Sequence, residues 1–276
     1  MAESVHMLAA LKRQIASLDR GVADRISVRR PIGHDAIDRA LGGGLGGGRV
    51  HELFGAVEEE GAAAGLALLF ASNAAGDTAP MLWLRTAASG RAGGFAYGPG
   101  LAALGIDPER LLVGMMADEA MLLRTAVDAL RQPALGALLI ELRGPAPLLD
   151  LTASRRLALA AEGSGVTAFM LRIGAEPGPS AADTRWRVAA APSLPLPGET
   201  PGMSAFALTL LRQRAGPDGM EWRLRWDSEK GVFGDAGDER DDDKAVGGTG
   251  RAERGTALSG ALVSISAARS AADRAA

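Results

Sequence analysis

The sequence predicts an α/β fold built on a mostly parallel sheet with helices on both faces. Short apolar runs alternate with helix-like segments along the middle of the chain, which is the pattern of successive strand–helix–strand units. Several runs are apolar throughout, above all "LGALLIEL" at 135–142, as expected of strands that are buried on both faces. The remaining elements are taken below in chain order.

Length and composition limit the possible classes of protein. A chain of 276 residues can form one large domain or one domain with appendages, and we favour the second. The net charge of -3 produces no overall field that would draw the chain onto nucleic acid or an anionic membrane. The chain contains no cysteine, which excludes disulfides and thiolate metal sites and fits a reducing cytoplasm.

Neither a metal site nor a membrane segment is expected. His6, His34 and His51 have no spacing that suggests a shared metal ion. The longest apolar run, 61–71, is much shorter than the roughly 20 residues that cross a bilayer. The N-terminus carries charges inside an amphipathic pattern and does not resemble a signal peptide. We therefore expect a cytoplasmic protein.

Residues 1–25 are expected to contribute an amphipathic helix over about 4–20. Its apolar positions recur at intervals of three and four, and they are Leu8, Leu11, Ile15 and Leu18. This narrow stripe either packs on the chain's own core or binds a partner, and the sequence leaves both possibilities open.

The core is expected over 26–232, and its first half supplies the elements around the central strand. A short helix at 36–41 is broken by the glycine run 42–48, and a strand follows at 50–54. The later elements alternate as strand 81–84, helix 99–104, strand 111–116, helix 118–131, strand 135–142, helix 151–162 and strand 166–171.

The core is expected to end in a β-hairpin. "TRWRV" is one strand candidate, and "FALTLLRQ" and "EWRLRWD" flank the turn "RAGPDG". In the last strand Trp222, Leu224 and Trp226 share one face, while Arg223 and Arg225 share the other. The arginine face is either solvated or a surface for a partner or for phosphates.

Residues 233–276 are predicted to be a disordered tail. The segment "DAGDERDDDK" holds six acidic and two basic residues, and Gly, Ser, Thr, Ala and Arg dominate after it. Such a composition cannot bury enough apolar surface to offset the entropy of ordering.

The segment "FGAVEEEGAAAGLALLF" at 54–70 has the outline of a phosphate-binding loop without its chemistry. Gly55 and Gly61 are separated by five residues instead of four, and Ala62 and Ala63 stand where lysine and a hydroxyl residue are needed. The run 58–60 adds three glutamates where a polyanion would bind. No cofactor is expected.

The order of these motifs resembles the RecA-type ATPase core over roughly residues 30–230. The resemblance is carried by "PIGHDAIDRALGGGLGGGRVHELFG", by "GLAALGIDPERLLV" at 100–113, by "ALLIEL" and by the terminal hairpin. Within that superfamily the segment "GLAALGIDPERLL", the loop without lysine and the short hairpin are most similar to the ImuA family.

This resemblance implies a role in SOS-induced, error-prone translesion DNA synthesis. The implied partners are RecA and a polymerase-like mutagenesis protein, to which the chain would act as a non-catalytic adaptor. The resemblance also implies that Glu141 matches the acid that supports magnesium in RecA-type ATPases. The water-polarising glutamate expected just after 81–84 is replaced by "RTAAS". Hydrolysis depends on such groups, so we expect no enzymatic activity.

The resemblance places single-stranded DNA on two loops, near "RGPAPLLDLTASRR" and "GAEPGPSAADTR", which are short and poor in basic residues here. Arg143, Arg155 and Arg156 are the candidate contacts that are left. Solvated helix-face arginines are one interpretation, and a weak, salt-sensitive groove is the other. An ATP-independent factor that binds single-stranded DNA in recombination or repair is therefore the alternative function.

Overall fold

The structure is a computed structural model that describes residues 28–193, 202–214 and 216–236. The amphipathic stripe of Leu8, Leu11, Ile15 and Leu18 lies outside the described residues, and so does the tail beyond residue 236. Within the described residues, no helix combines the length and the apolar character that crossing a bilayer requires.

The described residues form one nine-stranded sheet, with the strand order β11-β10-β9-β8-β3-β7-β6-β4-β5. Its parallel part comprises β3 (Val50–Gly55), β4 (Met81–Thr86), β5 (Leu111–Met116), β6 (Ala137–Arg143), β7 (Thr167–Ile173) and β8 (Thr184–Ala190). The antiparallel part comprises β9 (Ala205–Gln213), β10 (Met220–Asp227) and β11 (Val232–Asp235). The predicted α/β class and its mostly parallel sheet are confirmed.

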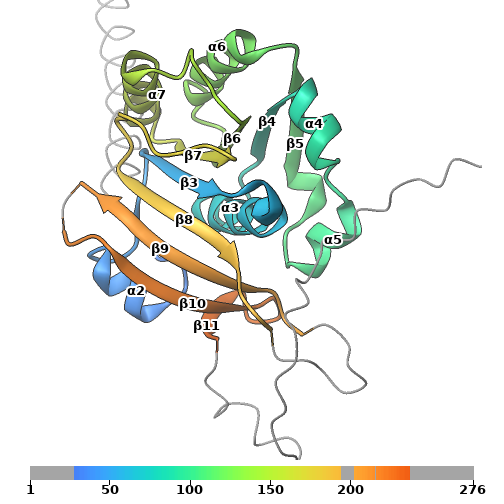
Figure 1. Cartoon of the computed structure of the whole chain (residues 1–276), viewed down its shortest axis with the longest axis vertical. Coiled ribbons are helices and arrows are strands. Elements are labelled where there is room, and N and C mark those ends of the chain that lie inside the picture. The colour runs from blue at the N-terminus through green and yellow to red at the C-terminus, as the bar shows by residue number, and fades with distance from the viewer. Residues whose placement is uncertain (1–27, 194–201, 215, 237–276) are drawn as a thin grey trace, which may run out of the picture.

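Helices cover both faces of the parallel part (Figure 1). α3 (Glu60–Ala75) lies on one face, whereas α6 (Glu119–Leu130) and α7 (Leu151–Ser164) lie on the other. Asp118 and Asp150 begin α6 and α7, because each aspartate side chain accepts a hydrogen bond from a backbone N–H of the first turn. α6 and α7 occur where the sequence predicts helices, at 118–131 and 151–162.

Shorter elements complete the described chain. They are β1 (Arg29–Arg30), α2 (Asp35–Ala40), β2 (Leu45–Gly46), η1 (Val57–Glu59), α4 (Ala87–Gly93), α5 (Gly98–Ala103) and η2 (Pro108–Arg110). β1 pairs with β2, which lies inside the glycine run 42–48. Gly44 has a φ of 114°, and an added Cβ there would lie 2.2 Å from the carbonyl oxygen of Arg30. The glycine run is therefore required for the chain to fold back closely on itself.

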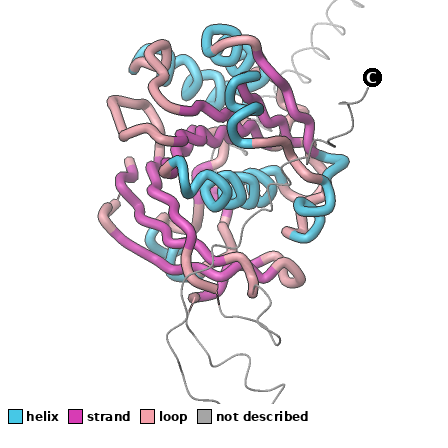
Figure 2. The backbone as a smooth tube through the Cα atoms, turned by 45° about the vertical axis from the view of Figure 1, so that its right-hand side comes forward, coloured by secondary structure: helices cyan, strands magenta, loops and turns pink. Residues whose placement is uncertain are grey.

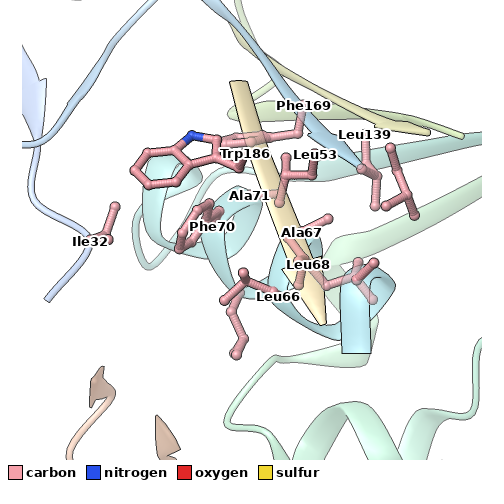
Figure 3. Close-up of a cluster of buried hydrophobic side chains, with 14 of the residues drawn as sticks. Ile32, Leu53, Leu66, Ala67, Leu68, Phe70, Ala71, Leu139, Phe169 and Trp186 are labelled. Carbon is pink, nitrogen blue, oxygen red and sulfur yellow. The ribbon is translucent and has the colours of Figure 1, made fainter. Parts of the chain in front are cut away.

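α3 is the centre of the larger core (Figures 2 and 3). The helix is apolar all round over 62–71, which is the pattern of a helix that is buried on every side. Its Phe70 contacts Phe169 on β7 and Trp186 on β8, with ring centroids 6.4 and 6.2 Å apart. These rings fix α3 against the middle of the sheet.

The antiparallel end of the sheet curves round α3. Phe70 also lies 6.1 Å from Phe233 of β11, although β7 and β11 are far apart in the strand order. Phe233 is 5% exposed and packs on Phe206 and Trp226 as well. The sheet thus continues through Asp235, beyond the core boundary expected at 232, because Phe233 completes this aromatic cluster.

Candidate functional site

The segment that resembles a phosphate loop joins β3 to α3 at the carboxyl end of the central strand. Its backbone forms η1 over 57–59, and α3 begins directly at Glu60. Gly61, Ala62 and Ala63 therefore lie inside the first turn of the helix. Glu60 is the first residue of the helix, where an acidic side chain is favourable at the positive end.

The connection is tightly packed between Gly55 and Ala63. A Cβ built on Gly55 would lie 2.6 Å from the Cβ of Ala63, which is fully buried. The carbonyl of Gly55 accepts a hydrogen bond of 2.8 Å from the N–H of Gly174, at the end of β7. The first turn of α3 is thus in direct contact with the end of β3.

This packing predicts opposite effects of two alanine substitutions. Gly55→Ala should lower the free energy of unfolding by about 1–3 kcal/mol, because the new methyl overlaps Ala63. Gly61→Ala should raise it by about 0.5–1 kcal/mol, because nothing lies within 4 Å and alanine favours the helix. Urea unfolding measures both, and equal effects of the two would contradict this description of the loop.

The three glutamates of the segment have separate environments. Glu58 is exposed to solvent. The carboxylate of Glu59 accepts a 2.7 Å hydrogen bond from the N–H of Ala190, at the end of β8. Glu60 forms an ion pair with Arg143, at the end of β6. Only Glu60 therefore lies among the charged residues at the ends of β4 and β6.

Arg85 and Glu141 form a second ion pair that is buried between neighbouring strands. Arg85 ends β4 and Glu141 lies near the end of β6, and their side chains are 3% and 1% exposed. The guanidinium donates a 2.9 Å hydrogen bond from Nη2 to Oε1 of Glu141, and its Nε lies 2.8 Å from Oε2. It also donates to the carbonyl of Gly94 at 2.6 Å and lies 4.5 Å from the ring centroid of Trp83. The pair is therefore a buried, close ion pair with one charge-assisted hydrogen bond.

The two ion pairs meet at Gly93. A Cβ at this glycine would lie 2.2 Å from Oε1 of Glu60 and 3.1 Å from Nη2 of Arg85. Both side chains therefore lie against the bare backbone of Gly93, at the end of α4. The result is a cluster of two carboxylates and two guanidiniums, which we call the charge cluster: Glu60, Arg85, Glu141 and Arg143.

The four charges of the charge cluster are paired with one another. Burial raises the pKa of Glu141, against the lowering effect of Arg85, and the nearby Glu60 carboxylate raises it further. Arg85 contacts both carboxylate oxygens of Glu141, the residue for which the sequence resemblance implies a match to a magnesium-supporting acid. Among the described residues, no group of three or more histidine and carboxylate side chains could hold a metal ion. Nor does the cluster contain a lysine or hydroxyl side chain.

The loops that follow β6 and β7 are held by internal hydrogen bonds. The N–H of Ala181 donates to the hydroxyl of Ser154 at 2.8 Å, and the carboxylate of Glu119 accepts from the N–H groups of Leu148 and Leu149. Arg155 and Arg156 are exposed on α7, whereas Arg143 is part of the charge cluster. The structure therefore does not gather Arg143, Arg155 and Arg156 at one loop.

The last hairpin separates its faces as its alternation predicts. Leu224 and Trp226 are buried and Trp222 is half-buried, while Arg223 is exposed on the opposite face. Arg225 shares that face and is half-buried. β10 lies between β9 and β11 in the antiparallel part of the sheet.

Comparison with known proteins defines the family. No family model matches this chain. Protein ImuA from two strains of Caulobacter vibrioides, NA1000 / CB15N and ATCC 19089 / CIP 103742 / CB 15, is 34% identical to it over 204 residues. The match covers 68% of this chain and 80% of the relative. This chain belongs to the ImuA family.

The fold of this ImuA-family chain is RecA-like. It is similar to the crystal structure of the RadB recombinase, with a TM-score of 0.50 and 16% sequence identity. The superposition covers 72% of this chain and 96% of the RadB chain. The expected RecA-like core is thus confirmed.

Sequence reasoning missed two residues of the site. It noted "RTAAS" after 81–84 as lacking a glutamate, but not that Arg85 would bind Glu141. A signal was present, because opposite charges end two apolar strands. Gly93 left no such signal, since only the folded backbone shows that Glu60 and Arg85 lie against it.

Proposed function

We propose that this chain is a non-catalytic RecA-like adaptor in SOS-induced, error-prone translesion DNA synthesis. It would bridge RecA, a polymerase-like mutagenesis protein, or both, to damaged DNA. Membership of the ImuA family and the RecA-like fold support a role in damage-induced mutagenesis. The charge cluster is the observation that carries the non-catalytic role, because Glu141 is bound by Arg85 and Glu60 by Arg143.

An adaptor needs an exposed surface that binds other proteins, and one edge of the described sheet provides such a surface. β5 is the outermost strand at one end of the described sheet, and Leu112 on it is 60% exposed. Val113 and Met115 are also exposed, and Phe95, 78% exposed, lies near Met115 beside Gly90. An unpaired edge strand with exposed apolar side chains can pair with an extended segment of another protein.

Nucleotide binding is the first test of this proposal. Isothermal titration of the full chain with ATP and magnesium should give no binding tighter than about 1 mM, because Arg85 and Arg143 are already paired with Glu141 and Glu60 and the loop has no lysine that could bind phosphate. A dissociation constant near about 1 μM would contradict the proposal, and turnover of ATP would do so more strongly.

Partner binding is the second test. RecA or the polymerase-like partner should co-purify with the intact chain and with a Val57→Glu control, which adds one charge at another exposed apolar residue. Leu112→Glu should reduce the recovery of the partner that pairs with β5 by about tenfold or more. The bridging role is wrong if neither partner co-purifies with the intact chain.

The exposed arginines favour a second candidate, an ATP-independent factor that binds single-stranded DNA. Arg155 and Arg156 on α7 and Arg223 on β10 present positive charge to solvent. Fluorescence anisotropy with an oligonucleotide distinguishes this candidate, because phosphate binding would weaken steeply as salt is raised.

A further inference from the structure

α6 and α7 lie side by side on one face of the sheet (Figure 1). The side chains of the two helices line a groove. Two adjoining cavities, of about 590 and about 630 Å³, share Val127, Arg131 and Arg156 and so form one continuous depression. One turn of helix with its side chains occupies roughly 400–600 Å³. α6 itself has 12 residues and is about 18 Å long, so the groove is long enough for about three helical turns.

The floor of this α6–α7 groove is apolar. Leu123 and Leu157 are buried beneath it, and Val127 packs on the same core cluster. Leu159, at one end of the groove, is 68% exposed, and Leu148, at the other end, is 51% exposed. Large apolar side chains that are exposed along a depression are typical of a surface that binds another apolar surface.

The rim of the groove is positively charged. Arg124 and Arg131 project from α6 and Arg156 from α7, and the carboxylate among the lining residues is Asp128. Asp128 pairs with Arg131 at 3.2 Å, so Arg124 and Arg156 give the rim its excess positive charge. An apolar floor between two arginines is complementary to a helix with leucine-like residues on one face and carboxylates beside them.

We propose that the α6–α7 groove binds an acidic amphipathic helix of another protein. The partner's apolar face would lie on Leu123, Val127 and Leu157, and its carboxylates would contact Arg124 and Arg156. This inference concerns the α6–α7 groove and not the exposed side chains of β5, and it does not depend on the nucleotide chemistry of the charge cluster.

The chain's own terminal segments fit the groove less well than a partner does. The amphipathic segment 4–20 carries Lys12, Arg13 and Arg20 against Asp19, so it has the same sign of charge as the rim. The acidic run after Asp235 leaves the sheet at β11, whereas α6 packs on β4, β5 and β6 at the other end. Charge and position therefore favour another protein as the occupant.

Anisotropy titration of the full chain tests the proposal with three labelled synthetic peptides. One is an acidic amphipathic helix of leucine and glutamate, the second replaces every glutamate with lysine, and the third breaks the acidic helix with a central proline. The acidic helix should bind at least about tenfold more tightly than either of the others. Equal binding of the acidic and basic peptides would overturn the proposal.

Two variants with the same change in charge locate the binding. The double variant Arg124→Glu/Arg156→Glu should weaken binding of the acidic peptide by at least about tenfold. Arg212→Glu/Arg223→Glu, on the exposed face of β9 and β10, should bind it like the unchanged chain. Loss of binding in both variants, or in neither, would show that the groove is not the site.

The absence of cysteine permits a direct test of the occupant. A photo-crosslinker attached to Leu159→Cys in the full chain should react with the acidic peptide, and mass spectrometry identifies the segment captured. Crosslinks into residues 1–27 or 237–276 in place of the peptide would assign the groove to the chain itself and overturn the proposal.

Discussion

Arg85→Ala is expected to lower the free energy of unfolding by about 3–5 kcal/mol, because it leaves the buried carboxylate of Glu141 without its partner. Water cannot replace the guanidinium easily, since the Glu141 side chain is 1% exposed. The substitution also removes the contact with Trp83 and the hydrogen bond to the carbonyl of Gly94. Urea unfolding of the intact chain and the variant measures the difference.

This loss should be larger at about pH 8 than at about pH 5. Arg85 lowers the pKa of Glu141, whereas burial and the Glu60 carboxylate raise it, so removing Arg85 raises this pKa further. A carboxyl group whose pKa is higher in the folded than in the unfolded state stabilises the fold while it is protonated. That stabilisation is lost as the pH rises through the folded-state pKa.

Two controls separate the ion pair from the general effect of losing an arginine. Arg91→Ala, at an exposed position of α4, should change the free energy of unfolding by less than about 0.5 kcal/mol. The double variant Arg85→Met/Glu141→Leu should recover most of the loss, because it leaves no buried charge without a partner. A cost below about 1 kcal/mol for Arg85→Ala at both pH values would contradict the structure of the charge cluster.

Phe233→Ala is expected to lower the free energy of unfolding by about 3–5 kcal/mol, although the residue lies in the outermost described strand. Its ring contacts Phe70, Phe206 and Trp226, with centroids 6.1, 6.3 and 4.6 Å away. Removing it opens a cavity beside α3 that these rings cannot fill. Thermal or urea unfolding of the full chain measures the effect.

The neighbouring residue supplies the matched control for this experiment. Val232 is 39% exposed in the same strand, and Val232→Ala should cost less than about 1 kcal/mol. Similar small costs for both substitutions would mean that β11 is not packed on the core, and that the fold ends at 232 as the sequence suggested.

Most of the sheet could be predicted because its strands have a strong local signal. The run 135–142 is apolar throughout and becomes β6, buried between β4 and β7. The alternation of Trp222, Leu224 and Trp226 gave the inward face of β10. β11 could not be found, because its short sequence lies beside the acidic run and depends on Phe233 reaching α3.

The charge cluster was only partly predictable, because its pairs join residues far apart in the chain. Glu60 and Arg143 are separated by 83 positions, and Arg85 and Glu141 by 56. The sequence showed that lysine and hydroxyl groups are missing and that Glu141 ends a buried strand. It could not show that Arg85 binds Glu141, since that requires β4 and β6 to be neighbours in the sheet.

The pairing of Glu60 with Arg143 and of Arg85 with Glu141 also bears on how such a molecule could be regulated. In RecA-like domains that bind and hydrolyse nucleotide, hydrolysis can limit the lifetime of the complex with a partner. In the proposed non-catalytic role, hydrolysis would not limit how long this domain stays bound to a partner. The lifetime of its complexes would then be set by their dissociation rate constants alone.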